Sequence, residues 1–94
     1  MKKIEFNEIA KDVERVSPKF FAVIVDLGLG ELELIVNTID NFESKMNYYN
    51  KIYDENMCHA HAPISIIDLI GADDISLIGD VYNMYLSERV QMNE

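Results

Sequence analysis

The sequence predicts an all-α fold, a small bundle of four or five helices around one long central helix. The main observation is a run of apolar residues from Leu32 to Tyr53, at alternating spacings of three and four. A shorter run with similar spacing lies near the N-terminus, and prolines and glycines fall where helices would end. At 94 residues, the chain is expected to form a single acidic globular domain over residues 1–94.

The first predicted helix covers the N-terminal residues up to Ser17-Pro18. Acidic residues separate four apolar ones in the pattern of an amphipathic helix: Phe6, Ile9, Val13 and Val16. Ser17-Pro18 ends this helix and also favours the start of another, because serine caps helices and proline suits their first turn. A second helix is therefore predicted over residues 18–27, closed by Gly28.

This second helix has an alternative, because its residues also favour strands. Residues 20–25 are rich in β-branched and aromatic side chains, and residues 31–34 alternate between acidic and apolar ones. Gly28 and Gly30 lie between the two segments and suit a tight turn. The alternative fold is therefore α+β, with a hairpin at residues 20–36.

The long central helix is predicted over residues 31–54. Seven apolar residues occupy its heptad positions: Leu32, Ile35, Ile39, Phe42, Met46, Tyr49 and Tyr53. A loop is expected after it, up to Pro63, because proline disfavours helical geometry in the residue before it.

Two further helices are predicted in the C-terminal part. Ser65 is placed to cap a short helix over residues 66–70 that stops at Gly71. Asp73 and Asp74 then lie at the first turn of a last helix, where acidic side chains complement the helix dipole, and this helix is expected to run to about Val90. The pair has the outline of a helix-turn-helix.

The chain is strongly acidic, with 17 Asp and Glu against 8 Lys and Arg and a net charge of −9. Direct DNA or RNA binding is not expected, because neutralising phosphates requires clustered basic residues. The helix-turn-helix outline does not change this expectation, because its second helix carries several acids and only Arg89 as a base. We therefore expect a charged partner to be basic.

The sequence predicts a cytoplasmic protein without a membrane span. The single cysteine, Cys58, cannot form an internal disulfide, and the N-terminal residues are charged rather than apolar. The longest apolar run, residues 20–25, is far shorter than the roughly 20 residues that span a bilayer.

Cys58, His59 and His61 are weak candidates for a metal site. They combine the sulfur and imidazole ligands that zinc and copper prefer, but a structural zinc site needs four ligands. We expect no metal, and interpret the three as a buried small thiol beside two loop histidines. No cofactor and no catalytic residue is expected, because Gly28-Leu29-Gly30 lacks the third glycine of a dinucleotide loop and no activated nucleophile is recognisable.

The predicted function is that of a small acidic, non-enzymatic protein-binding module that modulates, most simply by inhibition, a partner protein. Its composition is typical of AT-rich bacterial or phage genomes. Aromatic, sulfur-containing and acidic side chains are the predicted partner-binding residues: Phe42, Met46, Tyr49, Tyr53, Asp73, Asp74 and Asp80. The heptad spacing also suits a homodimer, so an oligomeric scaffold or assembly chaperone is one alternative.

A second alternative is an inhibitor that mimics nucleic acid and occupies the groove of a DNA- or RNA-binding protein. Its phosphate-like array would be made of the carboxylates that follow the first helix: Asp26, Glu31, Glu33, Asp40, Glu43, Asp54, Glu55, Asp68, Asp73, Asp74 and Asp80.

Overall fold

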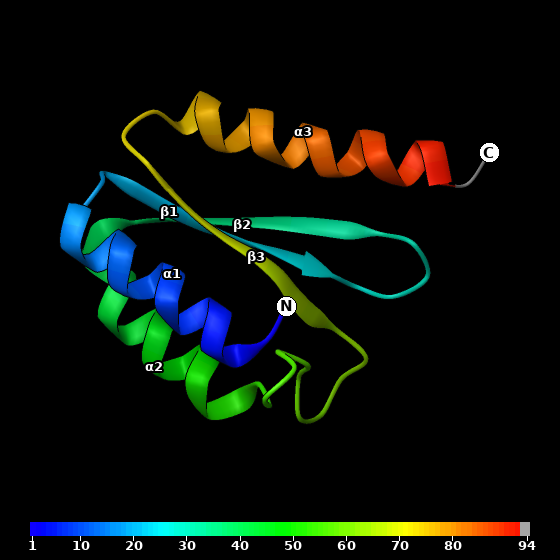
Figure 1. Ribbon diagram of the computed structural model, residues 1–94, viewed down its shortest axis with the longest axis horizontal. Helices are drawn as coiled ribbons and strands as arrows, with labels where there is room; N and C mark the ends of the chain where they lie inside the picture. The colour runs from blue at the N-terminus through cyan, green and yellow to red at the C-terminus, as the bar shows by residue number, and fades with distance from the viewer. Residues whose placement is uncertain (93–94) are drawn as a thin grey trace.

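Two helices pack on one face of a three-stranded sheet, and a third helix packs on the other face (Figure 1). The computed structural model describes residues 1–92. In chain order, the elements are α1 (Lys3–Val16), β1 (Phe20–Asp26), β2 (Leu32–Thr38), the 3-10 helix η1 (Ile39–Asn41), α2 (Phe42–Ile52), β3 (Ser65–Ala72) and α3 (Ile75–Met92). The strand order is β2-β1-β3, and both pairs are antiparallel. The predicted all-α helical bundle is therefore wrong, and the fold is α+β.

The helix predicted over residues 18–27 is also wrong, because these residues form the central strand β1. Residues 21–25 are all buried, since β1 has a strand on each side and helices on both faces. Such a continuous apolar run has no period that separates a strand from a buried helix. β1 and β2 form a hairpin whose register runs from Phe20 opposite Thr38 to Asp26 opposite Leu32, close to the hairpin of the alternative interpretation.

The predicted central helix over residues 31–54 is wrong in its first half. Residues 32–38 form β2, and η1 then leads into α2, which begins at Phe42. The three-four spacing does describe α2, because Phe42, Met46 and Tyr49 are its buried residues. The β-branched residues of this segment and the alternation over residues 31–34 favour the strand there.

The short helix predicted over residues 66–70 is wrong as well, because these residues belong to β3. The helix-turn-helix outline is consequently absent from the described part of the chain. Gly71 lies where β3 meets the end of α1: a Cβ added at Gly71 would lie 2.9 Å from Cγ of Pro18 and 3.1 Å from a methyl carbon of Val13. The last predicted helix is present as α3, but it begins at Ile75, so Asp73 and Asp74 precede its first turn instead of lying in it.

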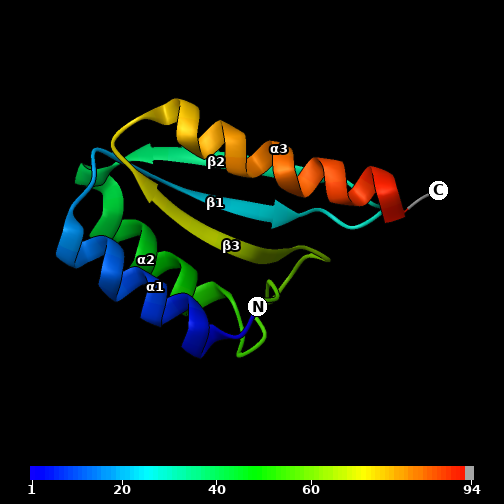
Figure 2. The ribbon, with the colours of Figure 1, turned by 45° about the horizontal axis from the view of Figure 1, so that its top comes forward.

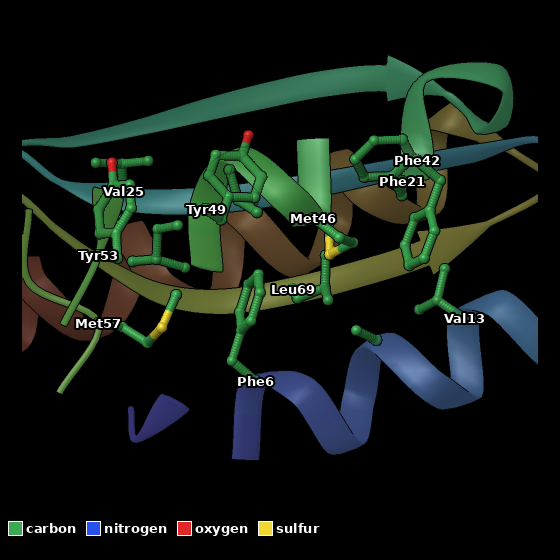
Figure 3. Packing of buried hydrophobic residues seen from close by; sticks show 13 residues of the cluster. Phe6, Val13, Phe21, Val25, Phe42, Met46, Tyr49, Tyr53, Met57 and Leu69 are labelled. Atoms are coloured by element: carbon green, nitrogen blue, oxygen red, sulfur yellow. The ribbon is translucent and has the colours of Figure 1, made fainter. Parts of the chain in front are cut away.

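The main core lies between the sheet and the helices α1 and α2 (Figure 3). Aromatic rings connect its layers, with edge-on pairs between Phe6 and Tyr49 at 6.0 Å and between Phe21 and Phe42 at 5.1 Å between ring centroids. Phe6 is fully buried, and burying such a side chain stabilises a fold by about 1.5–3 kcal/mol.

A smaller apolar layer lies on the opposite face of the sheet, under α3. Ala22 and Ile24 of β1 are fully buried there, as is Ile78 of α3. The hydroxyl groups of Tyr82 and Tyr85 attach α3 to the sheet, because they donate to the Leu32 carbonyl oxygen at 3.0 Å and to Oδ2 of Asp68 at 2.7 Å. None of the helices within residues 1–92 is both long and apolar enough to cross a membrane.

Candidate functional site

A groove of about 790 Å³ lies between α1 and α2, which run side by side beneath the sheet (Figure 2). Its lining comes from both helices, from the residue after α1 and from η1: Asn7, Ala10, Lys11, Glu14, Ser17, Ile39, Asp40, Phe42, Glu43, Met46 and Asn47. This volume lies within the range of roughly 300–1,000 Å³ that is usual for binding pockets. The groove is therefore our candidate binding site.

Polar contacts fix the two helices at one end of this groove. The Nζ of Lys3 donates to the backbone carbonyl oxygens of Asn50, at 2.9 Å, and of Tyr53, at 2.5 Å. Nδ2 of Asn7 donates to Oδ1 of Asn50 at 3.0 Å. Because the N-terminal part of α1 is attached in this way to the C-terminal end of α2, the groove opens along the opposite halves of the helices, toward Ser17.

The floor of the groove is apolar. Ala10, Phe42 and Met46 line it and are each only 7–8% exposed. The side chain of Ala10 is small and fills little of the hollow that it lines together with Phe42 and Met46. A thioether adapts its shape to different apolar groups, so this floor suits an inserted apolar side chain.

The rim of the groove is acidic. Glu14, Asp40 and Glu43 provide three carboxylates, and Lys11 provides one ammonium group. These four side chains are exposed and none of them forms an ion pair within residues 1–92. The rim therefore has a net charge of −2 and is free to attract cationic groups.

The predicted partner-binding residues on α2 and at its end are all buried in the main core (Figure 3). Phe42 and Met46 also line the groove, whereas Tyr49 and Tyr53 do not. Burial and the neighbouring tyrosines raise the pKa of Tyr49 to about 12, and burial also raises the pKa of Tyr53. Only Phe42 and Met46 therefore belong to the candidate site.

The three predicted aspartates lie away from the groove, at and within α3. Oδ1 of Asp73 accepts a hydrogen bond from the backbone N–H of Lys19 at 2.9 Å. Asp74 accepts hydrogen bonds from the backbone N–H and the hydroxyl of Ser76, which lower its pKa. Asp80 is exposed on α3. Asp73 and Asp74 thus have local structural roles, and none of the three joins Phe42 and Met46.

The weak metal candidates lie in the loop before β3. Cys58 is exposed, so the expectation of a buried thiol is wrong. Nδ1 of His59 accepts a hydrogen bond from the backbone N–H of His61 at 2.9 Å. The carboxylate of Asp54 accepts hydrogen bonds from the backbone N–H groups of Cys58 and Asn56, which lower its pKa. Within residues 1–92, no group of three or more potential metal-ligating side chains comes together.

The sequence interpretation did not bring together the residues of the rim. Asp40 and Glu43 appeared there only among the dispersed acids, and Lys11 and Glu14 had no predicted role. Only the small Ala10, on the buried side of α1, was a local signal for a hollow. Glu14 lies more than twenty residues from Asp40 in sequence, so their proximity depends on the packing of α1 against α2.

A second, smaller hollow of about 280 Å³ lies between α3 and β3 and is lined by Asp68, Val81, Met84, Tyr85 and Glu88.

In the comparisons with known proteins, no family model, no curated protein sequence and no solved structure matches this chain.

Proposed function

We propose that the protein is a non-enzymatic binding module, and that the groove between α1 and α2 binds an amphipathic, basic segment of another protein. One observation supports this most directly: an apolar floor lies inside a rim with three carboxylates and one lysine, none of them ion-paired within residues 1–92. The net charge of −9 favours the approach of a basic partner over long distances.

The groove determines the chemistry of the segment that it accepts. An amphipathic helix binds in a groove by placing apolar side chains on the floor and polar ones along the rim. Here the floor of Phe42, Met46 and Ala10 takes the apolar side chain, and the carboxylates of Glu14, Asp40 and Glu43 take lysines or arginines. Binding covers a basic surface of the partner, and this supports the proposal that the protein inhibits its partner.

Charge neutralisation on the rim tests this proposal without disturbing the core. The tagged full-length chain is used to capture proteins from a nuclease-treated lysate of the source organism or its host, and a captured protein is purified for titration. The rim variant carries Glu14→Gln, Asp40→Asn and Glu43→Gln. The matched control carries Glu5→Gln, Glu8→Gln and Asp80→Asn, which are exposed carboxylates outside the groove, so both variants have the same net charge.

The rim variant is expected to bind the captured protein about tenfold more weakly, because three exposed charge contacts of about 0.5 kcal/mol each amount to roughly 1.5 kcal/mol. The control is expected to bind like the unmodified chain within a factor of about two. An equal loss of affinity for the captured protein in both variants would contradict a specific role for the groove. Equal losses together with competition by DNA would support nucleic-acid mimicry instead.

A further inference from the structure

The two edges of the sheet differ, and the edge at β3 is protected. The N–H of Ile66 donates to the Met57 carbonyl oxygen at 2.9 Å, so the preceding loop covers the start of β3. A bulge follows, and the N–H of Leu69 then donates to Oδ1 of Asp68 at 2.8 Å instead of remaining free. Bulges, covering loops and blocked N–H groups are the devices that prevent an edge strand from pairing with another chain.

The opposite edge, at β2, has open main-chain groups. The hairpin register continues beyond both strand ends, where Leu27 N–H donates to Glu31 O and Ile39 N–H donates to Lys19 O. Odd-numbered residues of β2 therefore bond to β1, and the main-chain groups of the even-numbered ones face outward. The Leu32 oxygen accepts the Tyr82 hydroxyl. The outward groups of Leu34 and Val36 have no hydrogen-bond partner within residues 1–92.

Four of the seven side chains of β2 are apolar: Leu32, Leu34, Ile35 and Val36. β2 carries one charged residue, Glu33, and no lysine or proline that would discourage pairing. Above it, Ile75 and Leu86 of α3 are 53% and 36% exposed. Both lie on the same side of α3 as Tyr82, at seven and four residues from it, and Tyr82 reaches β2. Leu34 and Val36 point to the α3 face of the sheet and thus form one uncharged strip with Ile75 and Leu86, whereas Glu33 and Ile35 point to the opposite face.

We propose that β2 pairs antiparallel with β2 of a second copy of this chain, so that the two sheets join into one. With the twofold axis at Ile35, Leu34 of each copy lies opposite Val36 of the other and exchanges main-chain hydrogen bonds with it. This register places Ile35 against Ile35, and Glu33 against Asn37 rather than against a second glutamate. This register also gives hydrogen-bond partners to the outward N–H and C=O groups of Leu34 and Val36, which have none in the single chain.

The charge distribution favours a second copy over a basic partner at this edge. A basic partner would find only Glu33 for an ion pair, whereas a second copy presents the same apolar strip. The charges of two chains at −9 each do repel. However, the repulsion is screened over about 8 Å at physiological salt. Neither Ile35 nor any of the strip residues Leu34, Val36, Ile75 and Leu86 lines the groove, so this interface is independent of the proposed binding site.

Sedimentation equilibrium of the full chain tests the proposal. The dimer is expected to have a dissociation constant of about 100 μM or lower. This constant is expected to fall as salt rises, because salt screens the repulsion between the two chains. The double variant Ile75→Glu/Leu86→Glu is expected to raise the dimer dissociation constant at least tenfold. Leu77→Glu/Met84→Glu is the matched control, because these exposed residues lie on the other side of α3; it is expected to change the constant by less than about threefold.

A main-chain variant tests the strand pairing itself. Val36→Pro removes an outward N–H that the single chain does not use, and Val36→Thr retains it. The proline variant is expected to be monomeric and the threonine variant dimeric. Circular dichroism shows whether Val36→Pro folds. If it does not fold, the Ile75→Glu/Leu86→Glu variant tests the dimer instead. A monomer at every concentration and salt, or a dimer that none of these changes weakens, would overturn the proposal.

Cross-linking tests the register. In a Cys58→Ser background, Ile35→Cys is expected to give a disulfide-linked dimer on mild oxidation, because residues opposite each other in a non-hydrogen-bonded pair lie close enough. Asn37→Cys is the control and is expected to remain uncross-linked, because the two copies of residue 37 are separated along the strands. Cross-linking through residue 37 and not through residue 35 would overturn the pairing. If the rim variant loses partner binding but remains dimeric, the groove and the β2 edge act independently, so the failure of one proposal can be told from the failure of the other.

Discussion

Replacing Gly71 by alanine tests how closely β3 packs against the end of α1. The new Cβ would lie 2.9 Å from Cγ of Pro18 and 3.1 and 3.2 Å from the two methyl carbons of Val13, and both neighbours are buried. Overpacking of this kind costs about 1–3 kcal/mol, and the reduced freedom of the unfolded chain offsets about 0.4–1 kcal/mol of it. We therefore expect a net loss of about 1–2 kcal/mol and a Tm lower by roughly 5–15 °C.

Gly79→Ala is the matched control, because no atom lies within 4 Å of a Cβ added there and Gly79 is inside α3. It is expected to stabilise the protein by about 0.5–1 kcal/mol. Urea unfolding of both variants measures the two effects.

A double-mutant cycle separates the contact with Val13 from a general effect of losing glycine. Val13→Ala removes the two methyl groups that crowd residue 71, so Gly71→Ala is expected to cost about 1 kcal/mol less in that background. Strictly additive costs, or a Gly71→Ala variant as stable as the unmodified chain, would refute the packing described for β3 and α1.

Three further predictions concern the sheet and its helices. Tyr85→Phe removes the 2.7 Å hydrogen bond to Asp68 and is expected to lower the unfolding free energy by about 1–2 kcal/mol in urea; no change would contradict the contact. Because folding raises the pKa of Tyr49 to about 12, its hydroxyl loses its proton at a lower pH in the unfolded chain than in the folded one. The titration of Tyr49 is therefore expected to leave the unfolding free energy unchanged below pH about 10 and to lower it between pH about 10 and about 12. Thermal unfolding measured at each pH is expected to show a shallower fall in Tyr49→Phe. Leu29 is fully exposed with a φ of 54°, so Leu29→Asn is expected to stabilise the hairpin turn by about 0.5–1 kcal/mol, and a lower urea midpoint would contradict this.

The sequence predicted α1 and α3 and the residues of α2 as helical, but it did not show where α2 begins, and it favoured helices over the strands of the sheet. α1 has one buried side, so its apolar residues keep the period of a helix. Apolar residues occur on both sides of β2, because Ile35 packs against the main core while Leu34 and Val36 point to the opposite face, so the alternation of a half-exposed strand is lost after Leu34. Leu32 and Ile35 are three residues apart and point to opposite faces, which by coincidence matches the heptad spacing of α2.

The candidate site was predictable only in part, for a similar reason. Phe42 and Met46 follow from the helical period of α2, and the structure places them on the groove floor. Glu14 became a rim residue only because α1 packs against α2, a contact that no local pattern specifies. Asp73 was predicted as a first-turn acid of the last helix and as a partner-binding residue, but its hydrogen bond to Lys19 depends on the neighbouring ends of β1 and β3.

The separation of charge between the two proposed surfaces makes them distinguishable by salt alone. Binding of a basic segment at the rim of Glu14, Asp40 and Glu43 is expected to weaken as salt rises, because opposite charges are screened. Pairing of two β2 edges is expected to strengthen over the same series, because the charges it must overcome have the same sign. If the captured protein instead occupied the β2 edge, its binding would compete with the dimer and would be insensitive to the rim variant. Opposite salt responses, each abolished by its own variant, therefore require two separate surfaces on this chain.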